Sequence, residues 1–253
     1  MEDQCGNSVL CVVPARLGST RFPGKMLAPL CGRPLVLHAY ERARKARLVS
    51  SALIATDDVQ ILQAVEPFGA RCEMTRADHA SGTDRIAEVA ARHPEADVVV
   101  NVQGDEALID PAVVDAVVQA LLDDPEAAIA TAACPIRNTE RLDDPNVVKV
   151  VCDIRGRALY FSRARIPHVR DAVDASGARY LQHLGLYAYR RDRLLAFAGL
   201  PQTPLEKLEK LEQLRALENG WIIRVIETDY AGIGVDVPAD LEVVQKLLEQ
   251  GLG

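Results

Sequence analysis

The chain has 253 residues, 49% of them hydrophobic, with 29 basic against 36 acidic residues and a formal net charge of -7. This length and apolar content can bury one sizeable core, so we expect a single domain over residues 1–253. The acidic balance argues against a protein that binds by neutralising many nucleic-acid phosphates, whereas a small anionic ligand needs only a few local cations.

The first predicted element is a strand over Val9–Pro14, which runs into a loop rich in glycine and cations. The stretch VVPARLGSTRFPGKM differs from a P-loop, because five residues separate Gly18 from Gly24 and Met26 stands where a P-loop has serine or threonine. Its glycines let backbone N–H groups approach an anion. The loop therefore predicts phosphate binding, with a solvated basic turn as the alternative.

Up to residue 134, short apolar runs alternate with helix-like stretches, a pattern typical of an α/β fold with a doubly wound, mostly parallel sheet. The next expected strands are Ala52–Thr56, Val98–Val102 and Ile129–Ala133. The expected helices are Leu35–Arg47, Val59–Val65, Asp84–Arg92 and Pro111–Leu122. Ligands of such sheets bind where strands end and loops lead into helices, so the residues after each strand are the candidate site.

Two of these loops carry polar side chains. TRADHASGTDR places Ser81 and Thr83 before a helix, where their hydroxyls either bind a polar ligand or only cap the helix, and His79 fits no zinc-binding spacing. In NVQGDEA, Asp105 comes shortly after an apolar strand, and Gly104 forms the bend between them. A carboxylate there could hold Mg²⁺ against phosphate oxygens, or belong to an exposed acidic turn.

Residues 135–190 differ in character and predict an inserted sheet or hairpin. The strand-like runs are Val147–Cys152, Ala158–Phe161 and Tyr180–Tyr189, with a polar segment around Asp171–Gly177. Alternation along the last run places His183 and Tyr187 on one face with Gly185 between them. Such a face suits a ligand edge, and an ordinary amphipathic strand explains it equally well.

The C-terminal part predicts a helix from Pro204 to about Asn219, a strand over Trp221–Ile226 and a helix over Pro238–Gln250. On the first helix Glu212 would share a face with apolar residues, where a carboxylate usually has a partner. Asp236 stands one residue before the expected cap, Val237, so ordinary capping does not explain it. Asp236 is therefore a second candidate carboxylate.

The cysteines and the chain start indicate a compartment. The six cysteines, at positions 5, 11, 31, 72, 134 and 152, form no CxxC pair, so we expect reduced thiols rather than a zinc or redox site. The first residues lack a signal-peptide pattern, and no apolar run approaches a membrane span. We expect a soluble, cytoplasmic protein with no membrane partner.

The order and number of these segments resemble one family, the 3-deoxy-manno-octulosonate cytidylyltransferases, or CMP-Kdo synthetases. The resemblance runs through VVPARLGSTRFPGK, MTRADHASGTDRIAEV, VVNVQGDEALID, ALYFSRARIP, QHLGLYAYR, PLEKLEKLEQLRALENG and GIGVDVPADLE. It implies a nucleotide-diphospho-sugar transferase fold whose smaller inserted sheet, at about residues 135–190, binds the sugar and forms a homodimer. Ala107 and Gln182 depart from the proline and arginine of many relatives, without removing a proposed ligand contact.

The resemblance also assigns residues to roles. The implied nucleotide-binding set is Pro14, Ala15, Arg16, Ser19, Arg21, Lys25, Arg76, Ser81 and Gln103. The implied sugar-binding set is Gln103, Arg163, His183, Tyr187 and Glu212. Asp105 and Asp236 match metal-binding aspartates, and with Arg16 and Lys25 they make up the implied catalytic set.

The implied reaction is Mg²⁺-dependent transfer of CMP from CTP to the C2 hydroxyl of Kdo, giving CMP-Kdo and pyrophosphate for lipopolysaccharide biosynthesis. It needs positioning and charge neutralisation rather than a covalent nucleophile. Two alternatives stay open: a cytidylyltransferase for another acidic sugar, such as a sialic acid or an amino-Kdo, and a noncatalytic nucleotide-binding protein.

Overall fold

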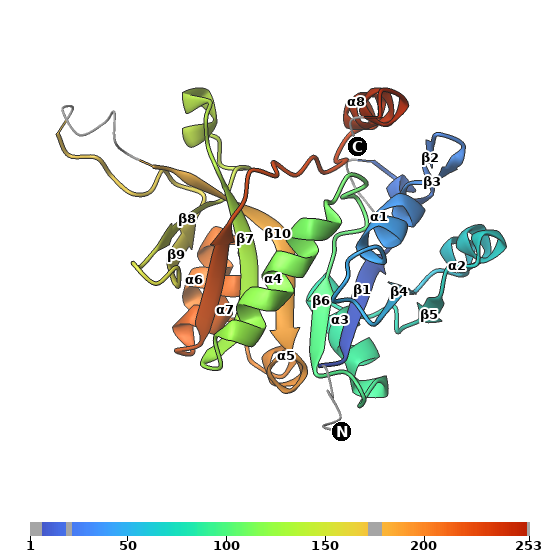
Figure 1. Cartoon of the computed structure of the whole chain (residues 1–253), viewed down its shortest axis with the longest axis horizontal. Helices are drawn as coiled ribbons and strands as arrows, with labels where there is room; N and C mark the ends of the chain where they lie inside the picture. The colour runs from blue at the N-terminus through green and yellow to red at the C-terminus, as the bar shows by residue number, and fades with distance from the viewer. Residues whose placement is uncertain (1–6, 19–21, 172–178, 252–253) are drawn as a thin grey trace, which may run out of the picture.

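The computed structural model describes residues 7–18, 22–171 and 179–251, and within them nine strands form one sheet with helices on both faces (Figure 1). The strands are β1 Val9–Ala15, β4 Ser51–Thr56, β5 Cys72–Met74, β6 Val98–Asn101, β7 Ala127–Pro135, β8 Lys149–Cys152, β9 Ala158–Ser162, β10 Leu181–Arg190 and β11 Ile222–Glu227. A separate pair is formed by β2 Pro29–Leu30 and β3 Arg33–Pro34. The helices are α1 Leu35–Ala43, α2 Val59–Val65, α3 Gly82–Arg92, α4 Pro111–Asp123, α5 Arg191–Ala198, α6 Pro204–Glu209, α7 Gln213–Glu218 and α8 Pro238–Glu249, and the 3₁₀ turns are η1 Lys25–Leu27, η2 Glu66–Phe68 and η3 Thr139–Leu142.

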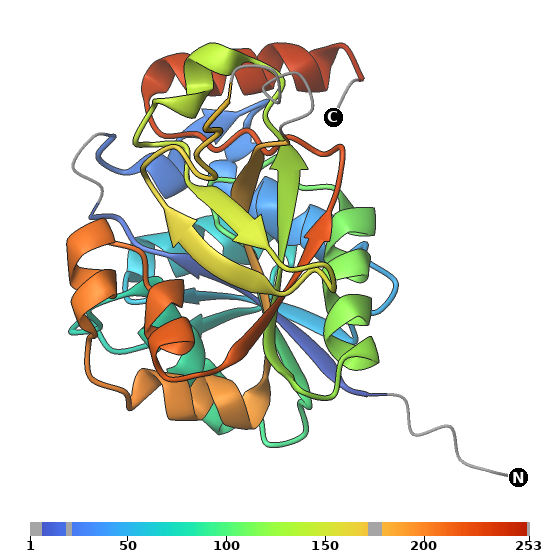
Figure 2. The same cartoon turned by 90° about the vertical axis from the view of Figure 1, so that its left-hand side faces the viewer.

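The strand order β11-β7-β10-β6-β1-β4-β5 confirms the mostly parallel sheet. β1 runs parallel to β4 and β6, whereas β10 lies antiparallel between β6 and β7. The predicted inserted strands are present as β8 and β9, which face the viewer in Figure 2. They are hydrogen-bonded through the start of β10 to the main sheet, so they extend it.

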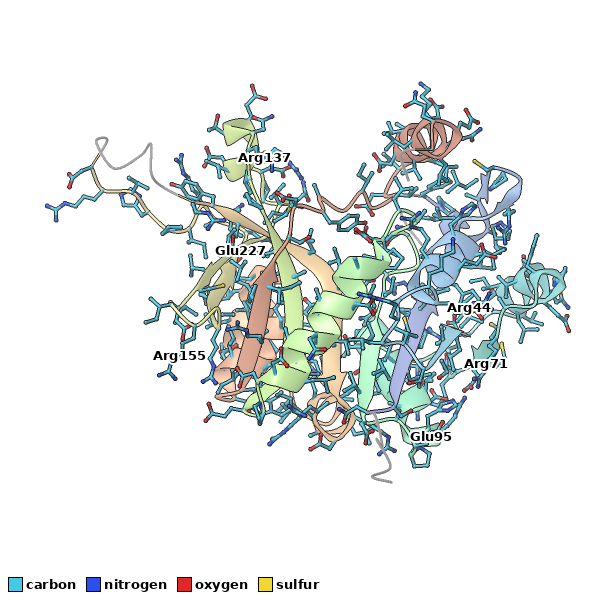
Figure 3. All side chains as sticks on the ribbon, in the orientation of Figure 1. Arg44, Arg71, Glu95, Arg137, Arg155 and Glu227 are labelled. Carbon is cyan, nitrogen blue, oxygen red and sulfur yellow. The ribbon has the colours of Figure 1, made fainter. Side chains whose placement is uncertain are left out.

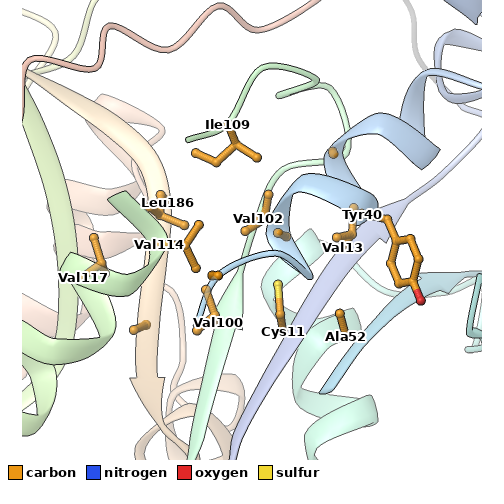
Figure 4. Packing of buried hydrophobic residues seen from close by; sticks show 14 of the residues in the cluster. Cys11, Val13, Tyr40, Ala52, Val100, Val102, Ile109, Val114, Val117 and Leu186 are labelled. Carbon is orange, nitrogen blue, oxygen red and sulfur yellow. The ribbon is translucent and has the colours of Figure 1, made fainter. Parts of the chain in front are cut away.

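Alternation along β1 packs the sheet on both sides. Cys11 and Val13 point to the face covered by α1, α2 and α4 (Figure 4), and Leu10 and Val12 point to the face covered by α3, α5 and α7. A third apolar cluster, which includes Val244 of α8, covers the loop after β6. The carboxyl ends of β1 and β6 lie beside each other because the two strands pair in parallel.

Several predicted bounds need correction. The predicted helix Leu35–Arg47 ends at Ala43, and the strand β5 and helix α5 are additions. The predicted long helix from Pro204 is wrong, because it breaks into α6 and α7 at Lys210, whose φ is +55°. The guanidinium of Arg163 donates to the carbonyl oxygens of Glu209 (2.6 Å) and Lys210 (3.4 Å), so it satisfies groups left without helical partners.

Charged side chains cover the outside of this fold. Figure 3 shows Glu95 and Arg155 at the edge of the molecule, and Arg44 and Arg71 are exposed as well. Within the described part of the chain, no helix has both the length and the apolar content needed to cross a membrane.

Candidate active site

Two cavities adjoin at the carboxyl ends of β1 and β6. The first has a volume of about 360 Å³ and lies over the loops after these strands. The second, of about 650 Å³, extends towards β10, the β8–β9 hairpin and the break between α6 and α7. The residues that line both are Arg16, Ser81, Gly82, Gln103 and Asp236. A ligand in one cavity would therefore meet a ligand in the other.

A buried lysine joins two carboxylates in the first cavity. Lys25 Nζ lies 2.6 Å from Asp105 Oδ2 and 3.4 Å from Asp236 Oδ1. The Lys25 side chain is only 8% exposed, whereas those of Asp105 and Asp236 are 23% and 48% exposed. Its ammonium group offsets the repulsion between the two carboxylates, which come from segments far apart in the sequence.

The bend at Gly104 explains how Asp105 reaches Lys25. A Cβ atom at Gly104 would lie 2.9 Å from Met26 Sδ and 3.0 Å from the carbonyl oxygen of Pro14. Only glycine lets the loop after β6 pack this closely against the loop after β1. Asp105 is fixed in the same place by its own carbonyl oxygen, which accepts the N–H of Val235 at 3.1 Å.

Most of the predicted nucleotide-binding residues lie around the first cavity. Its lining includes Pro14, Ala15, Arg16, Lys25, Ser81 and Gln103. Ser81 caps α3 by accepting the N–H of Asp84 at 3.2 Å, which confirms the capping interpretation, and it also lines the first cavity. Arg76 is absent from the lining of either cavity, because its exposed side chain turns to Asp78 at 3.0 Å. Ser19 and Arg21 fall outside the described residues.

One face of α3 contributes two residues that the sequence did not single out. Arg85 is buried, lines the first cavity and pairs with Asp57 at 3.2 Å. Glu88 contacts the ring of His79 and accepts the N–H of Arg76 at 3.1 Å, which fixes the segment after β5. Burial opposes the charged form of Glu88, but these hydrogen bonds prevail and lower its pKa. Their spacing of three on a helix was the available signal.

The second cavity gathers all five predicted sugar-binding residues, which are Gln103, Arg163, His183, Tyr187 and Glu212. Gln103 Nε2 donates to the carbonyl oxygen of Gly185 at 3.3 Å, so the loop after β6 is bonded to β10 at this point. Glu212 accepts a hydrogen bond of 2.6 Å from the hydroxyl of Thr83. Glu212 lies in the break between α6 and α7, not on the helical face that we predicted for it.

His183 is neutral in this cavity. Thr131 Oγ1 donates its one proton to the carbonyl oxygen of Leu186 at 2.7 Å and lies 3.0 Å from His183 Nε2, so this nitrogen is the donor. Burial lowers the pKa of His183 from 6.5 to about 3. A ring that stays neutral in the folded state can accept a hydrogen bond at Nδ1.

This pKa predicts acid sensitivity. Between pH 6.5 and about 3 the unfolded chain binds a proton at position 183 that the folded chain does not, so stability should fall as the pH falls through this window. Replacing His183→Asn removes this contribution. From pH 7 to pH 5 the free energy of unfolding in urea should fall by about 2 kcal/mol less in the variant than in the wild type. Equal losses in both proteins would contradict the assignment.

Glu106, next to Asp105 in the loop after β6, helps to hold the aspartate side of the first cavity. Burial, reinforced by the charge of the neighbouring Asp105, raises the pKa of Glu106 to about 7. Its Oε2 accepts a hydrogen bond of 3.0 Å from the Tyr230 hydroxyl, which opposes that shift. The contact ties the loop after β6 to the segment that carries Asp236.

The carboxylates of Asp105 and Asp236 suit a metal ion that is also bound by the phosphates of a nucleotide. Among residues 7–18, 22–171 and 179–251, no three His, Cys, Asp or Glu side chains converge as a metal site. Asp105 and Asp236 nevertheless both approach one ammonium nitrogen. Mg²⁺ is commonly held by one or two carboxylates, with phosphate and water oxygens completing the shell. The two aspartates fit that requirement.

Comparison with known proteins gives close relatives. A family model described as "Cytidylyltransferase" matches residues 10–227. The 3-deoxy-manno-octulosonate cytidylyltransferase of Syntrophotalea carbinolica is 52% identical over 244 residues, which cover 94% of this chain and 97% of the relative. The protein of the same name from Geobacter sulfurreducens is 53% identical over 249 residues, which cover 95% of this chain and 99% of the relative.

Solved structures of cytidylyltransferases match this fold. The structure of CMP:2-keto-3-deoxy-manno-octonic acid synthetase complexed with CTP matches with a TM-score of 0.91 and 45% identity, covering 97% of this chain and all of that one. A cytidylyltransferase from Leptospira borgpetersenii, with 15% identity, a TM-score of 0.65 and coverage of 96% of this chain and 87% of its own, shares the fold alone. The fold class expected from the sequence is confirmed.

Proposed function

Because this chain belongs to the cytidylyltransferase family, and within it to the 3-deoxy-manno-octulosonate cytidylyltransferases, we propose that it transfers CMP from CTP to the C2 hydroxyl of Kdo and releases pyrophosphate. This reaction makes the activated sugar used in lipopolysaccharide biosynthesis. The observation that carries the proposal is the junction of the two cavities beside Lys25, Asp105 and Asp236.

The junction suits in-line phosphoryl transfer. CTP in the first cavity would place its phosphates beside Arg16 and Lys25, and Kdo in the second would bring its C2 hydroxyl to the same edge. Both cations would stabilise the charge that develops on the departing pyrophosphate. Gln103 lines both cavities, and this supports the proposal that it contacts both substrates.

The cofactor that we propose is Mg²⁺. Asp105 and Asp236 would hold it, and it would supply charge neutralisation at the α-phosphate and lower the pKa of a coordinated hydroxyl. The chain itself keeps the two carboxylates close through Lys25. In this arrangement the loop after β1 would bind the phosphates and aspartates from other loops would hold the metal. A P-loop differs, because a hydroxyl after its lysine holds the metal.

The sugar would be held by two ring side chains, a carboxylate and a guanidinium group. His183 and Tyr187 present ring groups from β10, and Glu212 can accept hydrogen bonds from sugar hydroxyls. Arg163 donates from Nε and Nη1 to carbonyl oxygens at 2.6 and 2.8 Å, which fixes its guanidinium while leaving other N–H groups for the sugar carboxylate.

Product analysis tests this function. Purified protein with CTP, Mg²⁺ and Kdo should release pyrophosphate and give CMP-Kdo by mass spectrometry, and competition with a sialic acid and an amino-Kdo should favour Kdo. Preference for one of the other sugars would replace Kdo in the proposal. Binding of CTP by calorimetry with no turnover of any sugar would favour the noncatalytic alternative.

We also propose that the protein is cytoplasmic and works as a homodimer built through the β8–β9 hairpin. Among the described residues β9 pairs as a strand only with β8, so its other edge is open beyond the bridge that Arg157 makes to Arg224. Ile154 is fully exposed at the turn and Leu159 is 62% exposed. Apolar side chains beside an open edge favour association with a second copy.

The dimer has its own measurement. Light scattering should give twice the chain mass of 27.5 kDa for the wild type, and the double variant Ile154→Asp with Leu159→Asp should shift the protein towards one chain mass. An Asp pair at the exposed apolar positions Val59 and Val243, far from the hairpin in sequence, is the control. A wild-type mass of one chain would contradict the dimer.

A further inference from the structure

We propose that Lys149 is a positioning residue of the sugar site: its buried ammonium group fastens the loop Asp144–Val148 to Arg163 and so holds one wall of the second cavity in shape. The inference rests on the proposed function for the identity of the ligand, an acidic sugar. Lys149 is not among the residues that line the cavity, so it acts through its neighbours.

The contacts of Lys149 are backbone contacts. Its side chain is completely buried at the start of β8, and Nζ donates to the carbonyl oxygens of Asp144 at 3.0 Å and of Arg163 at 2.5 Å. Removing an ammonium group from water is costly unless hydrogen bonds replace the lost hydration. Burial lowers the pKa of Lys149, and the nearby carboxylates of Asp144 and Asp143 oppose that shift. Lys149 therefore joins the loop to Arg163 through one carbonyl group of each, in addition to the direct hydrogen bond from Arg163 Nη1 to the carbonyl oxygen of Pro145.

The loop that Lys149 holds is fixed at two further points. The carbonyl oxygen of Pro145 accepts a hydrogen bond of 2.8 Å from Arg163 Nη1, and that of Val148 accepts the N–H of His183 at 2.8 Å. Both donors belong to residues that line the second cavity, as do Asn146 and Val148 of the loop. The loop, Arg163 and His183 thus form one hydrogen-bonded wall.

Arg163 extends this wall to the other side of the cavity. Its side-chain Nε donates to the carbonyl oxygen of Glu209 at 2.6 Å, where α6 ends. The backbone N–H of Arg163 donates to the Glu209 carboxylate at 2.9 Å. The break that follows presents Glu212 to the cavity. Because Lys149 holds the carbonyl group of Arg163, loss of its ammonium group should loosen both sides of the sugar site and leave the nucleotide side in place.

The test compares substrates in one variant. Lys149→Met has nearly the same shape and removes both hydrogen bonds, so the KM for Kdo should rise about 10-fold or more while the KM for CTP stays within about twofold. Lys207→Met, at an exposed lysine of α6, is the matched control and should change neither KM. Lys149→Gln keeps an amide donor and should give an intermediate rise, and it provides the measurement if the methionine variant does not fold.

Hydrogen exchange separates this inference from the proposed function. Amides of residues 146–148 should exchange faster in the Lys149 variants than in the wild type or in Lys207→Met, and this readout needs no turnover. If the wild-type protein does not turn over Kdo, the proposed function is overturned. The hydrogen exchange of residues 146–148 still tests the role of Lys149 in that case. Unchanged exchange, an unchanged KM for Kdo in an active variant, or equal rises in both KM values would overturn the positioning role.

Discussion

Replacing Asp105 with asparagine is expected to lower kcat for pyrophosphate release by about 10³-fold and to leave the fold intact. Asparagine has the same shape, and the fixed bend at Gly104 together with the bond from the Val235 N–H to the Asp105 carbonyl oxygen does not involve the carboxylate. The variant therefore loses charge without losing placement. Charge stabilisation is concentrated in the transition state, so the rate should fall more than CTP affinity.

The measurement is kcat at saturating CTP and Kdo over a series of Mg²⁺ concentrations. Asp192→Asn, which changes a carboxylate with a 78% exposed side chain in the first turn of α5, is the matched control and should keep wild-type kcat. The corresponding Asp236→Asn variant should resemble Asp105→Asn. Wild-type kcat in either active-site variant would remove that aspartate from the metal site.

Replacing Lys25 with methionine is expected to lower kcat/KM for CTP by about 10²-fold or more. The ammonium group is the buried partner of both Asp105 and Asp236, at 2.6 and 3.4 Å, and it faces the cavity where the triphosphate is proposed to bind. Without it, two carboxylates repel each other and the phosphates lose a cation held at low exposure. Both effects weaken the stabilisation of the triphosphate charge during CMP transfer.

Lys25→Arg separates charge from geometry. It restores a cation in a bulkier form, so kcat/KM should recover only in part. Lys45→Met, at an exposed lysine after α1, should behave as the wild type in the same pyrophosphate assay. If Lys25→Met kept the full kcat/KM for CTP, Lys25 would have no part in handling the phosphates.

The sequence predicted the layered frame because its apolar runs are long and regular. The runs at β1, β4 and β6 alternate with amphipathic helices, and the structure places them as parallel neighbours. Short elements such as β5 carry too few residues for such a pattern. The break at Lys210 was invisible for another reason: residues 204–219 look helical throughout, and the carbonyl groups at the break are bonded by Arg163, which lies 46 and 47 residues away along the chain.

The site was predictable where strand ends and the family resemblance agreed. Asp105 and Lys25 follow two strands and meet in space. Arg76 shows the limit, because the sequence cannot tell that its side chain turns outward to Asp78. Buried cations were missed for a physical reason: Lys149 reads as a surface residue until the structure places carbonyl groups around it.

The central claim is that one groove holds nucleotide and metal between Asp105 and Asp236, beside Lys25. Crystals grown with CTP and Mn²⁺ in place of Mg²⁺ test it most directly, since Mn²⁺ can be located by its anomalous scattering. The account predicts an anomalous peak within bonding distance of both carboxylates, with the triphosphate beside Arg16 and Lys25. Ordered CTP with its metal away from both aspartates would contradict it.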